Sequence, residues 1–135
     1  MKRPTHAALW ALARQCVFAR DGKVCRKCKR TPEDGVIIQV HHVIPKSVWG
    51  AGRYRLENLI AVCAGCHAFK VHSVELRVAV KIHAEIVGPE LMERLEMMRG
   101  TGRPVKFDPY ATLLYLQAEY GNLVAVPTSA ETPKP

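Results

Sequence analysis

The sequence predicts an α+β fold, in which a short metal-stabilised strand region is flanked by helices at the N-terminal and C-terminal ends. Two Cys-x-x-Cys knuckles enclose a β-branched run, and the segments outside them carry apolar residues at helical spacing. Apolar residues make up 48% of the 135 residues, which is enough for a core, but the cysteine region holds few large ones. A metal ion is therefore expected to replace part of the core there.

An N-terminal helix is expected over residues 4–20. Pro4 suits the first helical turn, apolar residues follow at helical spacing, and Asp21-Gly22 marks a turn at the end. Cys16 lies on the apolar side of this helix, so we expect it to be a small core residue.

A strand is expected over Val36–Ile44, after a turn-forming run at residues 31–35. It carries His41 and His42 near its end, and Pro45 follows. Because neighbouring strand residues point to opposite faces, the two imidazoles should have different roles.

A loop with two glycines follows at residues 45–56, and a short apolar stretch at 58–62 leads into the second knuckle. A helix is expected to begin near Cys66 and to carry His67 and Lys70 on its first turns.

Three further helices are expected, at residues 75–87, 90–99 and 110–120, and Gly121-Asn122 should close the last of them. The length favours one domain. Its expected parts are a domain at 1–125 with a core at about 20–75, an N-terminal helix at about 4–20 and C-terminal helices at about 75–121, and then a flexible Pro/Ser/Thr-rich tail at 126–135.

The charge of the chain favours a nucleic-acid partner. Twenty Lys and Arg residues against twelve Asp and Glu give a net charge of +8. The alternative is a basic surface without such a partner. No run approaches the roughly 20 apolar residues of a membrane span, so no membrane partner is expected. The odd cysteine count and the knuckle spacing favour a reducing, cytoplasmic location.

Four cysteines have the spacing of a structural zinc site: Cys25, Cys28, Cys63 and Cys66. Each knuckle supplies two thiolates, and two knuckles complete the tetrahedron that Zn²⁺ prefers. Four reduced buried cysteines are the alternative, which fits poorly because the first pair lies in the basic run CRKCKR.

The ordered set His-His, Asn and Cys-x-x-Cys-His gives the chain a resemblance to a known family. The matching segments are RDGKVCRKC (residues 20–28), HHVIPKS (41–47) and ENLIAVCAGCHAFK (57–70). They resemble the HNH endonucleases of the zinc-knuckle type. The resemblance implies a treble-clef-like ββα-metal core and metal-dependent hydrolysis of DNA phosphodiester bonds.

The resemblance also implies roles for individual residues. His42 matches the general base that activates water, and His41 and His67 match the ligands of one divalent metal ion. Asn58 matches the central asparagine, which braces a loop and is expected to orient His42. Mg²⁺, Mn²⁺ and Ni²⁺ all remain open as the catalytic metal, although imidazole ligands favour transition metals.

One position departs from relatives such as the nuclease colicins, which carry a further metal-binding histidine four residues after the one matching His67. Val71 occupies that position and His72 follows it. A two-ligand site completed by water and phosphate is favoured, with His72 as a third ligand left open. His6 and His83 lie on predicted helices without a partner motif and are interpreted as ordinary residues.

Four basic residues near the site are candidate DNA contacts: Lys46, Arg53, Arg55 and Lys70. A solvated surface is the alternative. Trp49 and Tyr54 could pack against sugar or base, or anchor their own loop. The C-terminal helices could support a homodimer.

Two functions remain open from the sequence. The first is a stand-alone, phage-like HNH endonuclease. The second is a non-catalytic zinc-binding nucleic-acid adaptor, which explains the charge and the cysteines but not the ordered histidines and asparagine.

Overall fold

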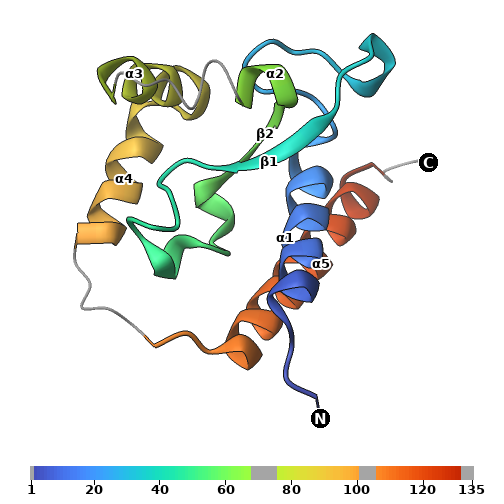
Figure 1. Ribbon diagram of the computed structural model, residues 1–135. Helices are drawn as coiled ribbons and strands as arrows, with labels where there is room; N and C mark the ends of the chain where they lie inside the picture. The colour runs from blue at the N-terminus through green and yellow to red at the C-terminus, as the bar shows by residue number, and fades with distance from the viewer. Residues whose placement is uncertain (1, 68–75, 101–105, 132–135) are drawn as a thin grey trace. The chain divides into compact units, whose positions relative to one another are not determined.

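The computed structural model describes residues 2–67, 76–100 and 106–131 of the chain, as drawn in Figure 1. The chain forms two compact units. We call Met1–Gly22 together with Lys106–Pro135 the helical unit, and Lys23–Val105 the cysteine unit. The fold is α+β, as the sequence predicts, because a two-stranded sheet is combined with helices.

The helical unit consists of α1 (His6–Asp21) and α5 (Pro109–Glu131), which lie side by side (Figure 1). The Thr5 hydroxyl caps α1 by accepting a hydrogen bond from the Ala8 amide at 3.0 Å. The buried residues of α1 recur at helical spacing and are Leu9, Ala13, Cys16 and Val17. Cys16 is a core residue as predicted, and its thiol donates to the Leu116 carbonyl of α5 at 3.5 Å.

Helix α5 begins where the sequence predicts and ends later. The Asp108 carboxylate accepts from the Tyr110 and Ala111 amides at 3.0 and 3.1 Å, which caps the first turn. The expected end at Gly121-Asn122 is wrong, because the helix continues to Glu131. A glycine lowers helix stability by only about 1 kcal/mol relative to alanine, so it does not by itself stop a helix. Residues 132–135 of the predicted tail lie outside the described part of the chain.

The sheet of the cysteine unit has two antiparallel strands, β1 (Ile38–His42) and β2 (Leu59–Cys63). The register pairs Ile38 with Cys63 and His42 with Leu59. Every residue of β2 is buried. The predicted strand with both histidines at its end is confirmed, and the second knuckle begins at Cys63, the last residue of the partner strand.

Among its described residues, the cysteine unit also has the α-helices α2 (Ala64–Cys66), α3 (Leu76–Val87) and α4 (Pro89–Gly100), and three short 3₁₀ turns at Pro32–Asp34, Gly50–Gly52 and Leu56–Asn58. The helix predicted to begin near Cys66 is present as the single turn α2, and residues 68–75 lie outside the described part. Helices α3 and α4 confirm the two predicted next. Gly88 separates them with a left-handed backbone angle, φ 89°, which glycine adopts without steric cost.

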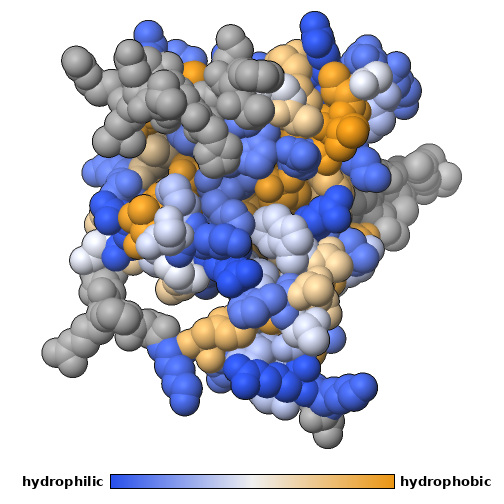
Figure 2. Space-filling view, viewed as in Figure 1, coloured by the Kyte–Doolittle hydropathy of each residue, from blue (hydrophilic) through white to orange (hydrophobic). Residues whose placement is uncertain are grey.

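The surface view is mostly hydrophilic, with hydrophobic residues in small groups (Figure 2). The most exposed large apolar side chains are spread over separate elements and include Ile37, Leu114 and Met97. Among the helices described, none combines the length and the apolar character needed to cross a membrane.

Leu116 and Leu114 test the packing of the helical unit. Leu116 is fully buried and Leu114 is 67% exposed on the same helix. We expect Leu116→Ala to lower the free energy of unfolding by about 2–5 kcal/mol, because it leaves a cavity. Leu114→Ala should change it by no more than about 0.5 kcal/mol. Chemical denaturation followed by circular dichroism measures both, and equal losses would contradict this packing.

Candidate functional site

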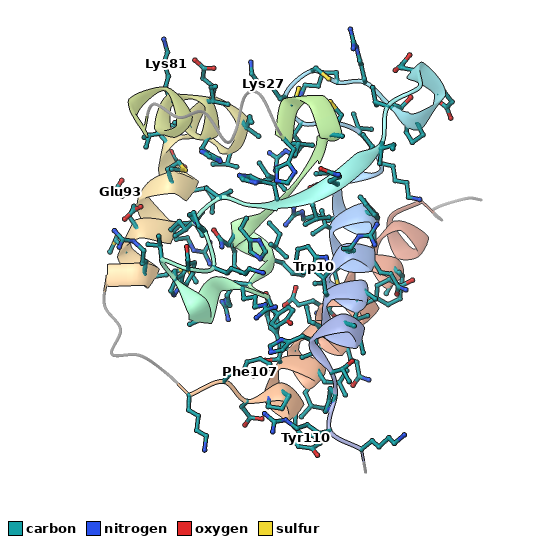
Figure 3. All side chains as sticks on the ribbon, in the orientation of Figure 1. Trp10, Lys27, Lys81, Glu93, Phe107 and Tyr110 are labelled. Carbon is teal, nitrogen blue, oxygen red and sulfur yellow. The ribbon has the colours of Figure 1, made fainter. Side chains whose placement is uncertain are left out.

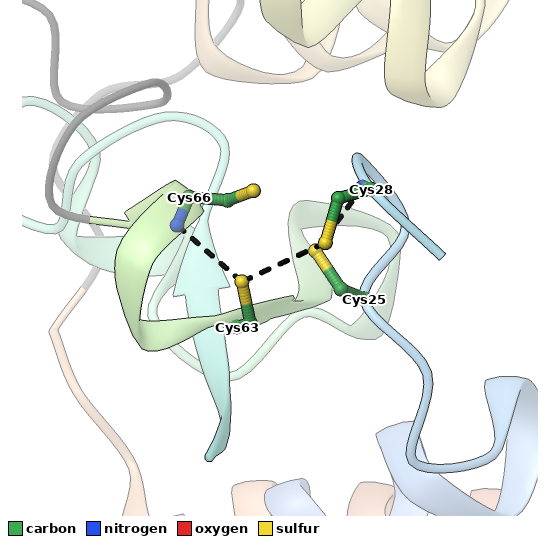
Figure 4. A group of neighbouring side chains, drawn as sticks. All are labelled: Cys25, Cys28, Cys63 and Cys66. Atoms are coloured by element: carbon green, nitrogen blue, oxygen red, sulfur yellow. Dashed lines mark hydrogen bonds between the residues drawn. The ribbon is translucent and has the colours of Figure 1, made fainter. Parts of the chain in front are cut away.

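The four knuckle cysteines converge on one point. Their sulfur atoms all lie within 4.8 Å of one another (Figure 4). A tetrahedral zinc ion with Zn–S bonds of about 2.3 Å places its sulfur ligands about 3.8 Å apart. The Cys28 and Cys63 sulfurs are 3.8 Å apart, so this group could hold a metal ion such as zinc.

The backbone around each knuckle accounts for this convergence. The amide of the second cysteine points at the sulfur of the first, with Cys28 N to Cys25 Sγ and Cys66 N to Cys63 Sγ both at 3.4 Å. The knuckles meet because the Arg26 amide donates to the Ala61 carbonyl of β2 at 2.9 Å. The first knuckle is therefore attached to the strand that ends at the second.

The thiols of this cluster have unequal acidity. Burial raises the pKa of Cys25, but backbone amides, the Cys28 amide first among them, outweigh burial and lower the pKa to about 6. Burial raises the pKa of the Cys66 thiol, and the three neighbouring sulfurs raise it further. The raised pKa of Cys66 disfavours four thiolates together, and a bound metal ion compensates their charge in such sites.

The two strand histidines have different surroundings, as the alternation of strand faces predicts. His41 is 4% exposed, and its ring meets the His67 ring edge-on, with centroids 4.9 Å apart. The structure thus brings together the two residues expected to share a metal. His83 of α3 also lies against His41, with the two Nε2 atoms 2.8 Å apart.

Gln39 is a residue of this cluster that sequence reasoning missed. Its side-chain oxygen lies 2.7 Å from Nδ1 of His67. Because an amide oxygen only accepts, Nδ1 carries the proton and Nε2 of His67 keeps the lone pair that a metal needs. The signal in the sequence was the two-residue spacing from His41, which puts both side chains on one face of β1.

His42 is half-buried, and its Nε2 donates to the Arg53 carbonyl at 2.9 Å. The proton of the neutral ring is therefore on Nε2, and the basic lone pair is on Nδ1. Burial lowers the pKa of His42, and the charges of Lys46 and Arg53 lower it further, against the raising effect of the Arg53 carbonyl. The ring is consequently neutral, and able to accept a proton, at neutral pH.

Asn58 is fully buried and holds both ends of the loop that follows β1. Its Oδ1 accepts from the Ile44 amide at 2.8 Å, and its Nδ2 donates to the carbonyls of Ile44 and Gly52 at 3.0 and 3.1 Å. The Gly52 carbonyl precedes Arg53, whose own carbonyl contacts His42. Asn58 thereby fixes the backbone that orients the His42 ring.

The aromatic residues of this loop contact the loop itself. A Cβ atom at Gly52 would collide with the Trp49 indole, so the absence of a side chain there lets the ring pack closely. Tyr54 is buried, and the Arg53 guanidinium lies 5.5 Å from the centre of its ring. Both aromatics occupy the position of a loop anchor.

The predicted DNA-contacting residues differ in their surroundings. Lys46 is exposed, Arg53 is half-buried, and Arg55 forms an ion pair with Glu57 at 3.2 Å. Burial raises the pKa of Glu57, but its own backbone amide and Arg55 outweigh burial, so the net pKa is lowered. The charge of Arg55 is thus partly compensated. Lys70 and His72 lie outside the described residues.

The cysteine unit thus combines a four-cysteine cluster that could hold a metal ion with a two-stranded sheet whose first strand ends in paired histidines. A family model described as HNH endonuclease matches residues 25–72. This match covers about a third of the chain and agrees with the resemblance that the sequence shows over the same segment. Comparison with curated proteins and with solved structures gives no match. Helices α1, α3, α4 and α5 lie outside the matched segment.

Cys63→Ser tests the cysteine cluster. Loss of one thiolate should remove the bound metal and lower the stability of the cysteine unit by several kcal/mol, because metal binding supplies folding free energy. Cys16→Ser is the matched control, because Cys16 is buried in the helical unit and should leave metal content unchanged. Elemental metal analysis and thermal unfolding measure both. Unchanged metal content in Cys63→Ser would contradict the assignment.

Asn58→Ala tests the hydrogen bonds of the Asn58 side chain to the backbone of Ile44 and Gly52, which we call the Asn58 clasp. It removes the three side-chain hydrogen bonds from a fully buried position, so we expect a loss of about 3 kcal/mol in the free energy of unfolding. Asn122→Ala is the control, because Asn122 is exposed on α5 and should change stability by less than about 0.5 kcal/mol. Chemical denaturation distinguishes them, and equal stabilities would exclude the clasp.

Proposed function

We propose that this protein is a metal-dependent endonuclease that hydrolyses DNA phosphodiester bonds in the cysteine unit. HNH domains are nuclease domains that bind nucleic acid, and the proposal specifies the reaction and the residues. The observation that carries the proposal is that His41 and His42, at the end of β1, have different surroundings. His41 lies in a buried group of imidazoles, while His42 is held by the Arg53 carbonyl beside basic residues.

His42 acts as the general base in this proposal. Nδ1 of the neutral ring accepts a proton from a water molecule as its oxygen attacks phosphorus. The bond from phosphorus to the 3′ oxygen then breaks, and that oxygen leaves with the bonding electron pair. The lowered pKa of His42 supports this role because the ring stays unprotonated at neutral pH.

His41 and His67 would hold the divalent metal ion. When bound, the cation supplies stabilisation for the negative charge that develops on the phosphate and the leaving oxygen. The donor set fits such an ion because Gln39 keeps the proton of His67 on Nδ1 and so leaves Nε2 for coordination. Neutral imidazole nitrogens favour Mn²⁺ or Ni²⁺ over Mg²⁺.

The cysteine cluster would hold a structural zinc ion. Its sulfur spacing fits Zn²⁺, and all four positions of the tetrahedron are taken by cysteine, which is typical of structural sites. The zinc would stabilise the strand pair on which the histidines lie.

Charge supports DNA as the substrate. The chain carries a net charge of +8, and Lys46 and Arg53 lie close enough to His42 for their charges to lower its pKa. Lys27 of the first knuckle and Lys81 of α3 also project outward from the cysteine unit (Figure 3). Contacts of this kind bind phosphate rather than base edges, so we expect weak sequence specificity.

Plasmid nicking tests the proposal. Zinc-loaded protein with added Mn²⁺, Ni²⁺ or Mg²⁺ should convert supercoiled DNA to the open-circular form. His42→Ala should lower the rate by about 10²–10⁴-fold, the usual contribution of a general base. His6→Ala is the matched control, since His6 is exposed in the helical unit.

Two outcomes of the nicking assay would contradict the proposed endonuclease function. Equal cleavage by wild type and His42→Ala would exclude His42 as the base. DNA binding without cleavage in any of the three metals would instead support the zinc-binding adaptor.

A further inference from the structure

A third histidine lies in the imidazole group and comes from outside the segment that matches the family. His83 is 7% exposed and lies on α3, whereas the match ends at residue 72. Its ring is nearly parallel to the His41 ring, with centroids 5.1 Å apart and an interplanar angle of 14°. His83 thus has a buried imidazole partner, which no motif around it in the sequence indicated.

The contact between His41 and His83 has the spacing of two ligands on one cation. Their Nε2 atoms are 2.8 Å apart, which requires that one ring donates a proton to the other. Two imidazole nitrogens bound to the same ion at about 2.0–2.1 Å lie about 2.8–3.4 Å apart, for octahedral or tetrahedral angles. A cation could therefore take the place of this hydrogen bond if the proton of the donor ring moves from Nε2 to Nδ1, which keeps both rings neutral, and if the rings tilt so that both Nε2 lone pairs point at the cation.

His67 is the third imidazole beside His41. Its ring lies 4.9 Å from the His41 ring, and Gln39 directs its lone pair to Nε2. His41 thus contacts an imidazole from the second knuckle and another from α3. From these contacts we infer that His41, His67 and His83 together form a three-imidazole site for a transition-metal cation. The inference rests on the proposed metal site but not on the reaction.

Helix α3 is attached to the first knuckle close to His83. The Arg26 guanidinium donates to the Ile86 carbonyl at 3.1 Å, in the last turn of α3. Ile86 is one helical turn from His83, so this bond holds the ring-bearing part of the helix beside the strands. The side chain of Arg26, which lies between Cys25 and Cys28, therefore helps to place the His83 ring.

Three neutral imidazoles select the class of metal. They carry no negative charge to attract Mg²⁺, which prefers oxygen ligands, and they suit Ni²⁺, Co²⁺, Cu²⁺ and Zn²⁺. Three protein ligands leave the remaining positions open, which is the arrangement of catalytic rather than structural sites.

Nickel binding to the zinc-loaded full chain tests the inference. Isothermal titration calorimetry should give one Ni²⁺ site in wild type, and His83→Ala should weaken it by more than about 100-fold. The basis is that losing an outer partner of a ligand already costs about 10–100-fold. His83→Phe keeps the volume of the ring and serves if the alanine variant is unstable. His6→Ala is the control and should bind Ni²⁺ as wild type does.

X-ray absorption at the nickel edge separates a ligand from a neighbour that only positions His41. Wild type should show three imidazoles around Ni²⁺, and His83→Phe should show two. An imidazole count of two in wild type would overturn the inference, and so would unchanged nickel affinity in His83→Phe or no nickel binding at all. The wild-type count does not depend on the folding of any variant.

The nicking assay keeps the two proposals distinguishable. Nickel binding that depends on His83, without DNA cleavage, would leave the three-imidazole site in place and exclude the nuclease. Cleavage by wild type, with nickel affinity unchanged in His83→Phe, would exclude the role of His83 alone.

Discussion

The pairing of β1 with β2 is the constraint on which both candidate sites depend. The register places Cys63 opposite Ile38 at one end of the ladder and His42 opposite Leu59 at the other. A slip of one residue would exchange the faces of His41 and His42, and it would carry Cys63 away from Cys28. An isolated two-stranded ribbon is only marginally stable in water, so this register needs support from outside the strands. The cysteine cluster supplies that support at one end, and the Asn58 clasp supplies it at the other.

The clasp explains why a buried polar side chain is tolerated at the start of β2. Burying an amide without partners costs about 1–3 kcal/mol, but both polar atoms of the Asn58 side chain have backbone partners. Because these partners belong to Ile44 and Gly52, the loop closes at a fixed width. The Arg53 carbonyl is then placed where it sets the tautomer of His42. A residue that carries no charge thus controls which nitrogen of the neighbouring histidine can accept a proton.

The features that could be predicted from the sequence are those that depend on residues close together in the chain. The β-branched run around Val40 and the spacing of the knuckle cysteines each depend on a few neighbouring residues, so the strand and the cluster were predictable. The contact of His83 with His41 spans 42 residues and leaves no periodic signal, so it could not be read from the chain. The end of α5 was mispredicted because Gly121 disfavours a helix only weakly. The Arg55–Glu57 ion pair depends on a tight turn that the composition did not reveal.

Arg26 connects three parts of the cysteine unit, namely the first knuckle, β2 and α3. Its amide donates to β2 at Ala61, and its guanidinium donates to α3 at Ile86. A backbone hydrogen bond contributes about 1 kcal/mol and one from a charged donor about 1.5–3 kcal/mol, so neither alone could hold a helix in place. The same residue is also covalently part of the knuckle, however, between Cys25 and Cys28. A cation bound by the four thiolates would stabilise the position of Arg26 far more strongly than these two bonds do. The sulfur cluster therefore supports the position of Arg26 and, through the bond to Ile86, the end of α3 that carries His83.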